Sequence, residues 1–177
     1  TMALWAKACV GARCVLDVGA NTGVFALSAK AITSTARVHC FEPIPRVRQR
    51  LVENVALNGM DILVHGIAIS DRKGTAQMHH DVSDHGYLAS LEQEPLSYEA
   101  GSFEVATERL DELLQLQGVE HVDLVKIDVT AFEPAVLRGM GPYLDQTPTL
   151  FVEVLSTAVA QAVEAAVTGR SYLFFRI

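Results

Sequence analysis

The chain has 177 residues, half of them hydrophobic and 20% charged, and its formal net charge at pH 7 is −7. This length is enough for one domain with a substantial core, and the composition is typical of a folded globular protein rather than a disordered one. The negative charge argues against nucleic acid or an anionic membrane surface as a partner. We therefore expect a single domain over residues 1–177.

Cysteine usage and the absence of targeting signals indicate a reducing compartment. No apolar run approaches the ~18 residues of a membrane span, and the N-terminus lacks the basic and long apolar regions of a signal peptide. The three cysteines, Cys9, Cys14 and Cys40, include no C-x-x-C pair. Cys14 and Cys40 lie in apolar runs and are interpreted as small core residues, with a disulfide between them as the alternative. A cytoplasmic location follows as an expectation.

Short apolar runs alternate with helical patterns along the chain. Strands are predicted at 13–18, 37–42, 62–70, 122–129, 149–154 and 171–177, and helices after Gly23 and at 45–58, 134–140 and 157–168. The strand runs are continuously apolar, which is typical of strands buried on both faces. This alternation predicts a mostly parallel sheet with helices on both faces, a three-layer α/β domain.

Residues 71–109 interrupt this alternation. The pattern predicts a hairpin-like excursion around Gly74, a long polar loop, and a strand near 103–107. Loops of this length are uncommon without a function, so the segment is a candidate substrate lid, with a merely mobile loop as the alternative.

Metal-ligand residue types gather within this segment, at His79, His80, Asp81, Asp84 and His85. Such side chains bind divalent metals. The segment is loop-like, however, and neighbouring residues of a strand point to opposite faces. We expect no metal site here, and a histidine acting as a base or a substrate contact is the alternative.

A glycine-framed turn, Gly19-Ala20-Asn21-Thr22-Gly23, follows the first predicted strand. In open α/β sheets ligands bind beyond the carboxyl ends of the strands. The two glycines leave room for close backbone approach, and Gly23 opens a helix whose free amide groups favour anionic or polar ligand groups. The spacing lacks the middle glycine of the dinucleotide fingerprint, and there is no Gly-Lys-Ser/Thr of a P-loop. Both observations argue against pyrophosphate binding.

Two acids lie at corresponding ends of adjacent predicted strands. Asp17 can face the ammonium group of a ligand, and Glu42 can accept hydrogen bonds from both hydroxyls of a ribose. A ligand with a ribose, an amine and no phosphate is S-adenosylmethionine. The alternatives are that Asp17 caps a helix, that Glu42 is a solvated strand end, and that the turn only reverses the chain.

Several segments occur in an order that resembles the FkbM-type S-adenosylmethionine-dependent methyltransferases, within the class I Rossmann-like superfamily. They are VLDVGANTGVFAL, FEPIPRVRQRLVENVALNG, GIAISDRKGTAQM, RLDELL, DLVKIDVTAFEPAVLRGM and LFVEVL. The resemblance spans residues 13–155. It implies a seven-stranded type of sheet in the order 3-2-1-4-5-7-6, and O-methylation as the commonest activity.

The same resemblance implies which residues contact the cofactor. Asp17, Gly19, Asn21 and Gly23 would line its methionine moiety, and Ala20 and Thr22 of the same turn are also expected to bind the cofactor. Glu42 would hold the ribose with Pro43 beside it, Ile67 and Ala68 would flank the adenine, and Asp128 would face the methyl group and the acceptor.

Three carboxylates are candidate catalytic residues. The methyl donor is already activated, so the protein mainly supplies alignment, although a hydroxyl acceptor also benefits from a base. Asp128 is the first candidate, Glu153 ends the neighbouring strand, and Glu133 opens the next helix. Alternatively, Glu133 serves helix electrostatics and Glu153 pairs with Lys126 or Arg138.

Two departures from the family bear on activity. The family usually has Glu-Gly where this chain has Thr130-Ala131, and it usually carries more sequence on one or both sides, so we expect the chain to be truncated at its ends. Three classes therefore stay open: an O-methyltransferase acting on a small molecule or sugar, an NAD(P) oxidoreductase, and a cofactor-binding domain with little or no catalysis, part of a larger biosynthetic protein. The glycine spacing counts against the second class. The sequence names neither the acceptor nor the oligomeric state.

Overall fold

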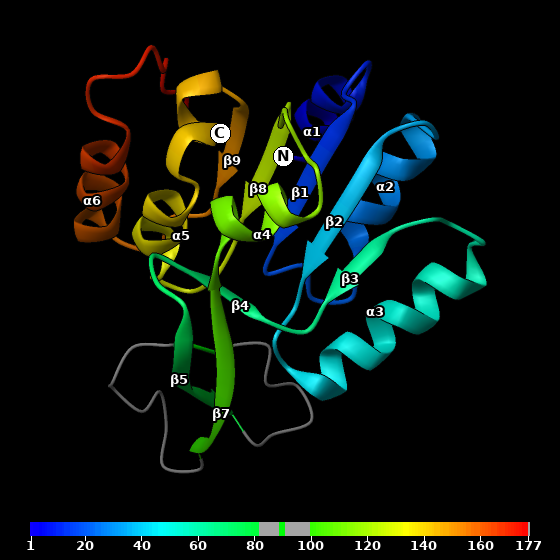
Figure 1. Ribbon diagram of the computed structural model, residues 1–177, viewed down its shortest axis with the longest axis horizontal. Coiled ribbons are helices and arrows are strands. Elements are labelled where there is room, and N and C mark those ends of the chain that lie inside the picture. Colours follow the sequence, from blue (N-terminus) through cyan, green and yellow to red (C-terminus); the bar gives the residue numbers. More distant parts are fainter. Residues whose placement is uncertain (82–88, 91–99, 177) are drawn as a thin grey trace.

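A five-stranded parallel sheet forms the centre of the computed structural model, which describes residues 1–81, 89–90 and 100–176 (Figure 1). Its strand order is β3-β2-β1-β8-β9. The strands are β1 Cys14–Val18, β2 Arg37–Phe41, β3 Leu63–His65, β8 Leu124–Ile127 and β9 Thr149–Val152. Because these are the first five predicted parallel strands in the order 3-2-1-4-5, this part of the expected topology is confirmed.

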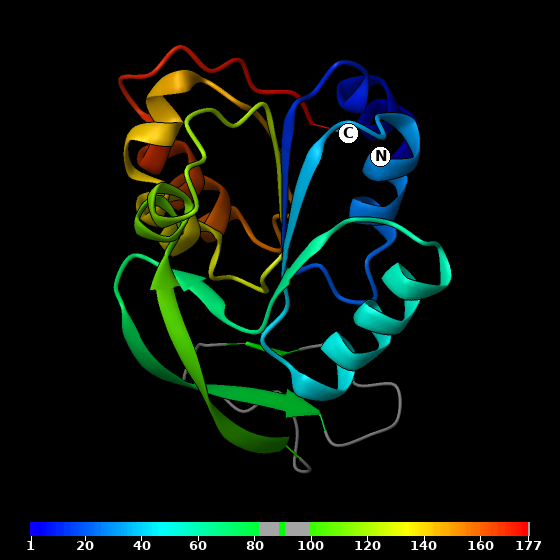
Figure 2. The same cartoon turned by 45° about the vertical axis from the view of Figure 1, so that its right-hand side comes forward.

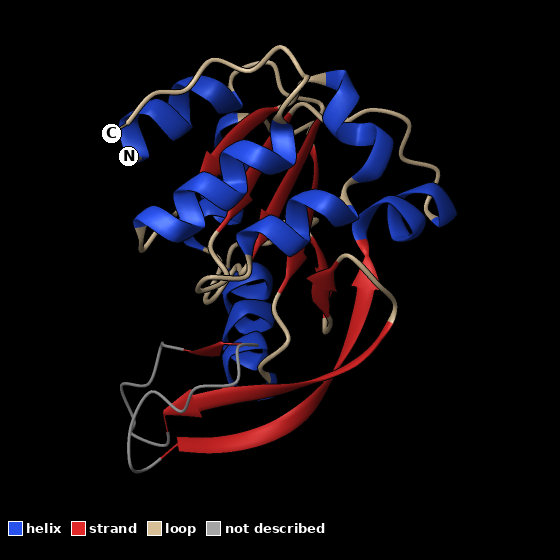
Figure 3. Ribbon diagram, turned by 90° about the vertical axis from the view of Figure 1, so that its left-hand side faces the viewer, coloured by secondary structure: helices blue, strands red, loops and turns tan. Residues whose placement is uncertain are grey.

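Helices cover both faces of this sheet and complete the expected three layers (Figures 1 and 3). One face packs on α1 Met2–Cys9, α2 Val24–Ile32 and α3 Pro45–Leu57. The other face packs on α4 Leu110–Leu116, α5 Glu133–Gly139, the 3₁₀ helix η1 Gly141–Gln146 and α6 Thr157–Val167. The patterns that predicted α2, α3, α5 and α6 hold, whereas α1 and α4 were not foreseen. α1 is fixed by Trp5, whose fully buried indole donates to the carbonyl of Phe25 at 3.1 Å.

A second sheet lies beyond the carboxyl ends of the first (Figures 1 and 2). Its order is β4-β7-β5-β6, with β4 Ala68–Ser70, β5 Gly74–Asp81, β6 Ala89–Ser90 and β7 Ala100–Arg109. The predicted strand at 62–70 is therefore two strands in two sheets. The chain leaves the main sheet at Gly66, and β4 pairs in parallel with β7 instead. The strand expected near 103–107 is confirmed within β7.

The last predicted strand, at 171–177, is wrong over the residues described, because 171–176 form no strand. Its apolar side chains face outward, with Leu173 and Phe175 each 83% exposed. The segment is held instead by side-chain bonds, since the Tyr172 hydroxyl donates to the carbonyl of Leu144 at 3.1 Å and Arg170 pairs with Asp145 at 2.7 Å. An apolar run predicts a strand only where a partner strand is in reach.

Part of the candidate lid over 71–109 lies outside the described residues, at 82–88 and 91–99, and so does His85. The side chains of His79 and His80, on β5, are also outside the description. Among the side chains that are described, no three histidines, cysteines or acids cluster to hold a metal ion. Cys9, Cys14 and Cys40 are free and buried, as core residues should be. Within the described ranges, no helix is long and apolar enough to cross a membrane.

Candidate active site

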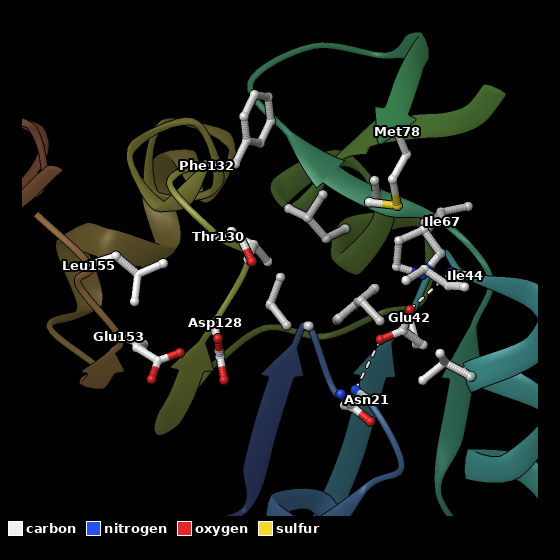
Figure 4. A pocket seen from close by; sticks show the side chains of 18 residues that line it. Asn21, Glu42, Ile44, Ile67, Met78, Asp128, Thr130, Phe132, Glu153 and Leu155 are labelled. Atoms are coloured by element: carbon white, nitrogen blue, oxygen red, sulfur yellow. Dashed lines mark hydrogen bonds between the residues drawn. The ribbon is translucent and has the colours of Figure 1, made fainter. Parts of the chain in front are cut away.

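An open cleft of about 350 Å³ lies where the carboxyl ends of the main sheet meet the second sheet (Figure 4). This volume is within the usual range for ligand sites. The lining residues come from both sheets and from the loops between them: Val18, Gly19, Asn21, Phe41, Glu42, Pro43, Ile44, Val47, Ile67, Ala68, Ile69, Met78, Asp128, Val129, Thr130, Phe132, Glu153 and Leu155. The cleft therefore contains Gly19, Asn21, Glu42, Pro43, Ile67, Ala68, Asp128 and Glu153 of the residues predicted from sequence.

The glycine turn packs tightly against the neighbouring strand ends. The amide groups of Gly19 and Ala20 donate to the carbonyl of Phe41 at 3.0 and 3.1 Å. Gly19 has φ +77°, and a Cβ there would lie 1.9 Å from the carbonyl oxygen of Asp128. The lack of a side chain at Gly19 thus allows the ends of β1 and β8 to approach closely, whereas the sequence pattern predicted this space for a ligand. Ala20, Thr22 and Gly23 do not line the cleft.

Glu42 follows β2 and is only 5% exposed, yet it faces the cleft. One carboxylate oxygen accepts the amide of Asn21 at 3.0 Å and the other accepts the amide of Ile44 at 2.9 Å (Figure 4). Burial raises the pKa of Glu42, while these two hydrogen bonds and Arg48 oppose the rise. Each carboxylate oxygen has a second lone pair, so Glu42 can still accept hydrogen bonds from a ligand.

The structure places Asp17 differently from the expectation. Its side chain is fully buried and does not line the cleft. One carboxylate oxygen accepts the amide of Ala26, in the first turn of α2, at 3.0 Å, and the other has no hydrogen-bond partner among the residues that the structure describes. Burial raises the pKa of Asp17 to about 6, although Lys126 opposes the rise. The helix-capping alternative therefore describes Asp17 better than contact with a ligand.

Two carboxyls, Asp128 and Glu153, lie together at the other end of the cleft (Figure 4). β8 and β9 pair Ile127 with Val152, so Asp128 and Glu153, which directly follow these two residues, lie side by side. The two carboxyls hydrogen-bond to one another, and Asp128 also accepts from the Lys126 ammonium at 2.8 Å.

This arrangement separates the acidities of the pair. Burial alone would raise the pKa of Asp128, but the hydrogen bonds from Glu153 and Lys126 outweigh burial and lower it. The same hydrogen bond, with the charge of Asp128, raises the pKa of Glu153 to about 7. Around neutral pH the pair therefore gains and loses one proton, and Glu153 is the residue that carries it. The alternative ion pairs of Glu153 do not form, since Lys126 binds Asp128 and Arg138 binds Asp71 at 3.0 Å.

Glu133 is 1% exposed and does not line the cleft. Its carboxylate accepts the amide of Val129 at 3.2 Å and also bonds the backbone of Ala131, which fixes the loop after β8. Thr130 and Ala131 in this loop have φ +52° and +70°. Ala131 thus holds, at a cost in backbone strain, the left-handed conformation that suits the family's usual glycine.

Sequence reasoning missed most of the apolar wall of the cleft. The missed lining residues are Val18, Phe41, Ile44, Val47, Ile69, Met78, Val129, Thr130, Phe132 and Leu155. Ile44 and Met78 belong to a small hydrophobic cluster around the second sheet. The motif positions next to Glu42 and Asp128 could have pointed to Ile44 and Thr130, but no local signal marks Met78.

Comparison with known proteins identifies the family. The model of the family described as "Methyltransferase FkbM domain" matches residues 17–173. The chain belongs to this FkbM family. The expected resemblance is therefore confirmed, and the FkbM domain here comprises both sheets and the cleft between them.

Curated relatives of this FkbM domain include longer proteins. The 2-O-methyltransferase NoeI of Sinorhizobium fredii is 31% identical over 153 residues, which cover 78% of this chain and 62% of NoeI. The hexuronic acid methyltransferase AglP of Haloferax volcanii is 34% identical over 140 residues, 78% of this chain and 54% of AglP. The AMB antimetabolite synthetase AmbE of Pseudomonas aeruginosa is 29% identical over 190 residues, which cover 89% of this chain but 9% of AmbE. The chain thus spans less than two thirds of each of these relatives.

Proposed function

We propose that this domain binds S-adenosylmethionine in the cleft and transfers its methyl group to a hydroxyl of a small molecule or sugar. One observation carries the proposal: a single apolar-walled cleft at the carboxyl ends of the sheet has Glu42 at one end and the Asp128–Glu153 pair at the other. Family membership supports methyl transfer as the reaction, and the names of NoeI and AglP support an oxygen atom and a sugar acid, respectively, as targets in those relatives.

The lining residues fit this cofactor. Glu42 retains acceptor capacity for a ribose diol, because each of its oxygens accepts one backbone amide. Ile67 and Ala68 supply an apolar surface suited to a purine ring, next to Ile44. Asp128 and Glu153 place negative charge where a cationic sulfonium would be favoured.

Different residues of the chain have different roles in the reaction. When bound, the donor supplies an electrophilic methyl group whose carbon–sulfur bond breaks as a carbon–oxygen bond forms, with the electron pair of the broken bond staying on sulfur. Glu42 fixes the donor's position, and Asp128 is held in place by Lys126. Ionised Glu153 accepts the proton of the acceptor hydroxyl, since its raised pKa makes it the stronger base of the two. We assign Asp128 to orienting Glu153 and the acceptor, and Glu133 to positioning the loop at 129–131.

A second candidate function is cofactor binding with little catalysis inside a larger biosynthetic protein. The match to AmbE favours it, because 89% of this chain aligns with only 9% of a synthetase. The Thr130-Ala131 departure also favours it, because the acid usual at that position is missing.

Methyl transfer from labelled S-adenosylmethionine to a panel of methyl glycosides and small alcohols distinguishes the two functions. We expect labelled methyl ether from the wild type and at least a tenfold lower rate from Glu153→Gln, because a positioned base typically contributes 10²–10⁴-fold. The exposed Glu164→Gln on α6 is the matched control and should retain the rate. Binding of S-adenosylhomocysteine with no transfer to any acceptor would instead support the second function.

A further inference from the structure

The carboxyl pair lies at the cleft end of a series of contacts that begins in the interior at Lys126 and Phe25. Lys126 is buried beside Asp128, with its side chain 10% exposed, and its ammonium lies 4.6 Å from the centre of the Phe25 ring. Asp128 in turn hydrogen-bonds Glu153, whose side chain opens to the cleft. Lys126 therefore favours the ionised form of Asp128 and leaves Glu153 to gain or lose a proton beside the cleft.

We propose that the Asp128–Glu153 pair lets the site distinguish the cationic methyl donor from its neutral product, because the pair gives up its shared proton when the donor binds. The same pair then takes up the proton of the acceptor hydroxyl during methyl transfer. This inference rests on the proposed function, because it assigns a further role to the same cleft. The donor carries a sulfonium and the product a thioether, so the two differ by one positive charge at the sulfur atom.

The charges balance across the step. With both carboxyls ionised, the pair carries −2 and the bound donor's sulfonium carries +1. Transfer forms the oxygen–methyl bond, breaks the sulfur–methyl bond and moves the hydroxyl proton to Glu153. The pair then carries −1 and the thioether carries no charge, so the sum at the site is −1 before and after. An uncompensated charge is costly in a partly buried site. Because the acceptor's proton goes to Glu153 as the sulfonium loses its charge, the net charge of the site stays the same and this cost is avoided.

The other ionisable groups around the pair are not placed to release a proton when the donor binds and to take one up during transfer. Lys126 on β8 stays bound to Asp128, and Glu133 on α5 is buried and committed to the backbone of the loop at 129–131. Asp17 on β1 is fully buried beneath the cleft and bonded to α2. Glu153 is the one member of this group that is exposed.

Calorimetric titration with S-adenosylmethionine and with S-adenosylhomocysteine tests the proposal without an acceptor. At pH 6.5, in phosphate and in imidazole buffers, the buffer dependence of the enthalpy gives the protons released on binding. We expect the donor to release about half a proton more than the product, because a positive charge a few ångströms from a partly exposed carboxyl lowers the proton affinity of that carboxyl about tenfold. The affinity ratio of donor to product should accordingly rise about tenfold between pH 5 and pH 8.

Glu153→Gln should abolish both the extra proton release and the rise in the ratio, and Glu164→Gln should preserve both. Equal proton release by the two ligands in the wild type, or an unchanged difference in Glu153→Gln, would overturn the proposal while leaving cofactor binding intact. If neither ligand binds the folded protein, the proposed function itself fails, and the proposal with it.

Discussion

The carboxyl of Asp17 is completely buried and, within the described part of the chain, accepts one hydrogen bond, from Ala26 to one of its two oxygens. Burial disfavours the ionised form and raises the pKa of this carboxyl from 3.8 to about 6. In the unfolded chain the same carboxyl ionises at lower pH. The unfolded state therefore loses its proton first, and the folded state is stabilised less as the pH rises from about 4 towards 7.

Asp17→Asn tests this cost, because asparagine keeps an acceptor for Ala26 and carries no charge. The free energy of unfolding of the wild type, relative to Asp17→Asn, should fall by about 2 kcal/mol between pH 4 and pH 7. Urea denaturation of both proteins at pH 4, 5, 6 and 7 measures it. A difference between the two proteins that stays constant with pH would show that Asp17 titrates alike in the folded and unfolded states.

Ala131 has a left-handed backbone with φ +70°, which costs an alanine roughly 1–2 kcal/mol. Ala131→Gly should raise the free energy of unfolding by about 0.5–1 kcal/mol, since glycine relieves the strain but loses more entropy on folding. Ala135→Gly, inside helix α5, is the matched control and should lower stability by about 1 kcal/mol. If both substitutions destabilise equally, the strain at Ala131 is absent.

Residue type and position predicted which acids lie near the site, but not which of them face a ligand. Glu42, Asp128 and Glu153 were found because each comes at the end of a parallel strand. Asp17 satisfied the same criterion, and Glu133 was chosen because it opens the helix after β8, yet both are buried and bond backbone amides. A carboxylate serves either purpose equally well, so only the three-dimensional direction of the side chain separates them.

At the scale of the elements, the ends of β1 and β8 approach so closely that Gly19 admits no side chain. Gly19→Ala should lower the free energy of unfolding by about 2 kcal/mol more than Gly11→Ala, because overpacking adds to the same conformational cost. Gly11 also has positive φ, at +80°, but has open space around its Cβ position. Equal losses in thermal or urea denaturation would contradict the close approach.

The strands and helices of the main sheet could be predicted because their apolar patterns are local. The strand predictions failed where the structure of a segment depends on which distant segment it pairs with. The run at 62–70 is mostly apolar along its whole length, but only its first half pairs in the main sheet. The run at 171–176 is as apolar as a buried strand, yet Phe175 is 83% exposed and no strand forms. Pairing between distant segments also explains why Met78, on β5, was not foreseen in the cleft.

Across the whole molecule, the cleft exists because the second sheet folds back over the carboxyl ends of the first (Figure 2). One wall comes from strand ends near residues 18, 42 and 128, and the other from residues 67–69 and Met78. Neither sheet alone would form a ligand site of this size. We propose that this joint cleft, with Glu42 in it, holds the methyl donor.

The most direct test of this claim is the dissociation constant of S-adenosylhomocysteine for the wild type and for Glu42→Gln, with Glu53→Gln on the exposed face of α3 as control. We predict micromolar binding by the wild type and by Glu53→Gln, and at least about tenfold weaker binding by Glu42→Gln, since a hydrogen bond to a charged group contributes roughly 1.5–3 kcal/mol. Circular dichroism should show that all three proteins are folded. Equal affinity in Glu42→Gln, or no binding by the folded wild type, would contradict the account.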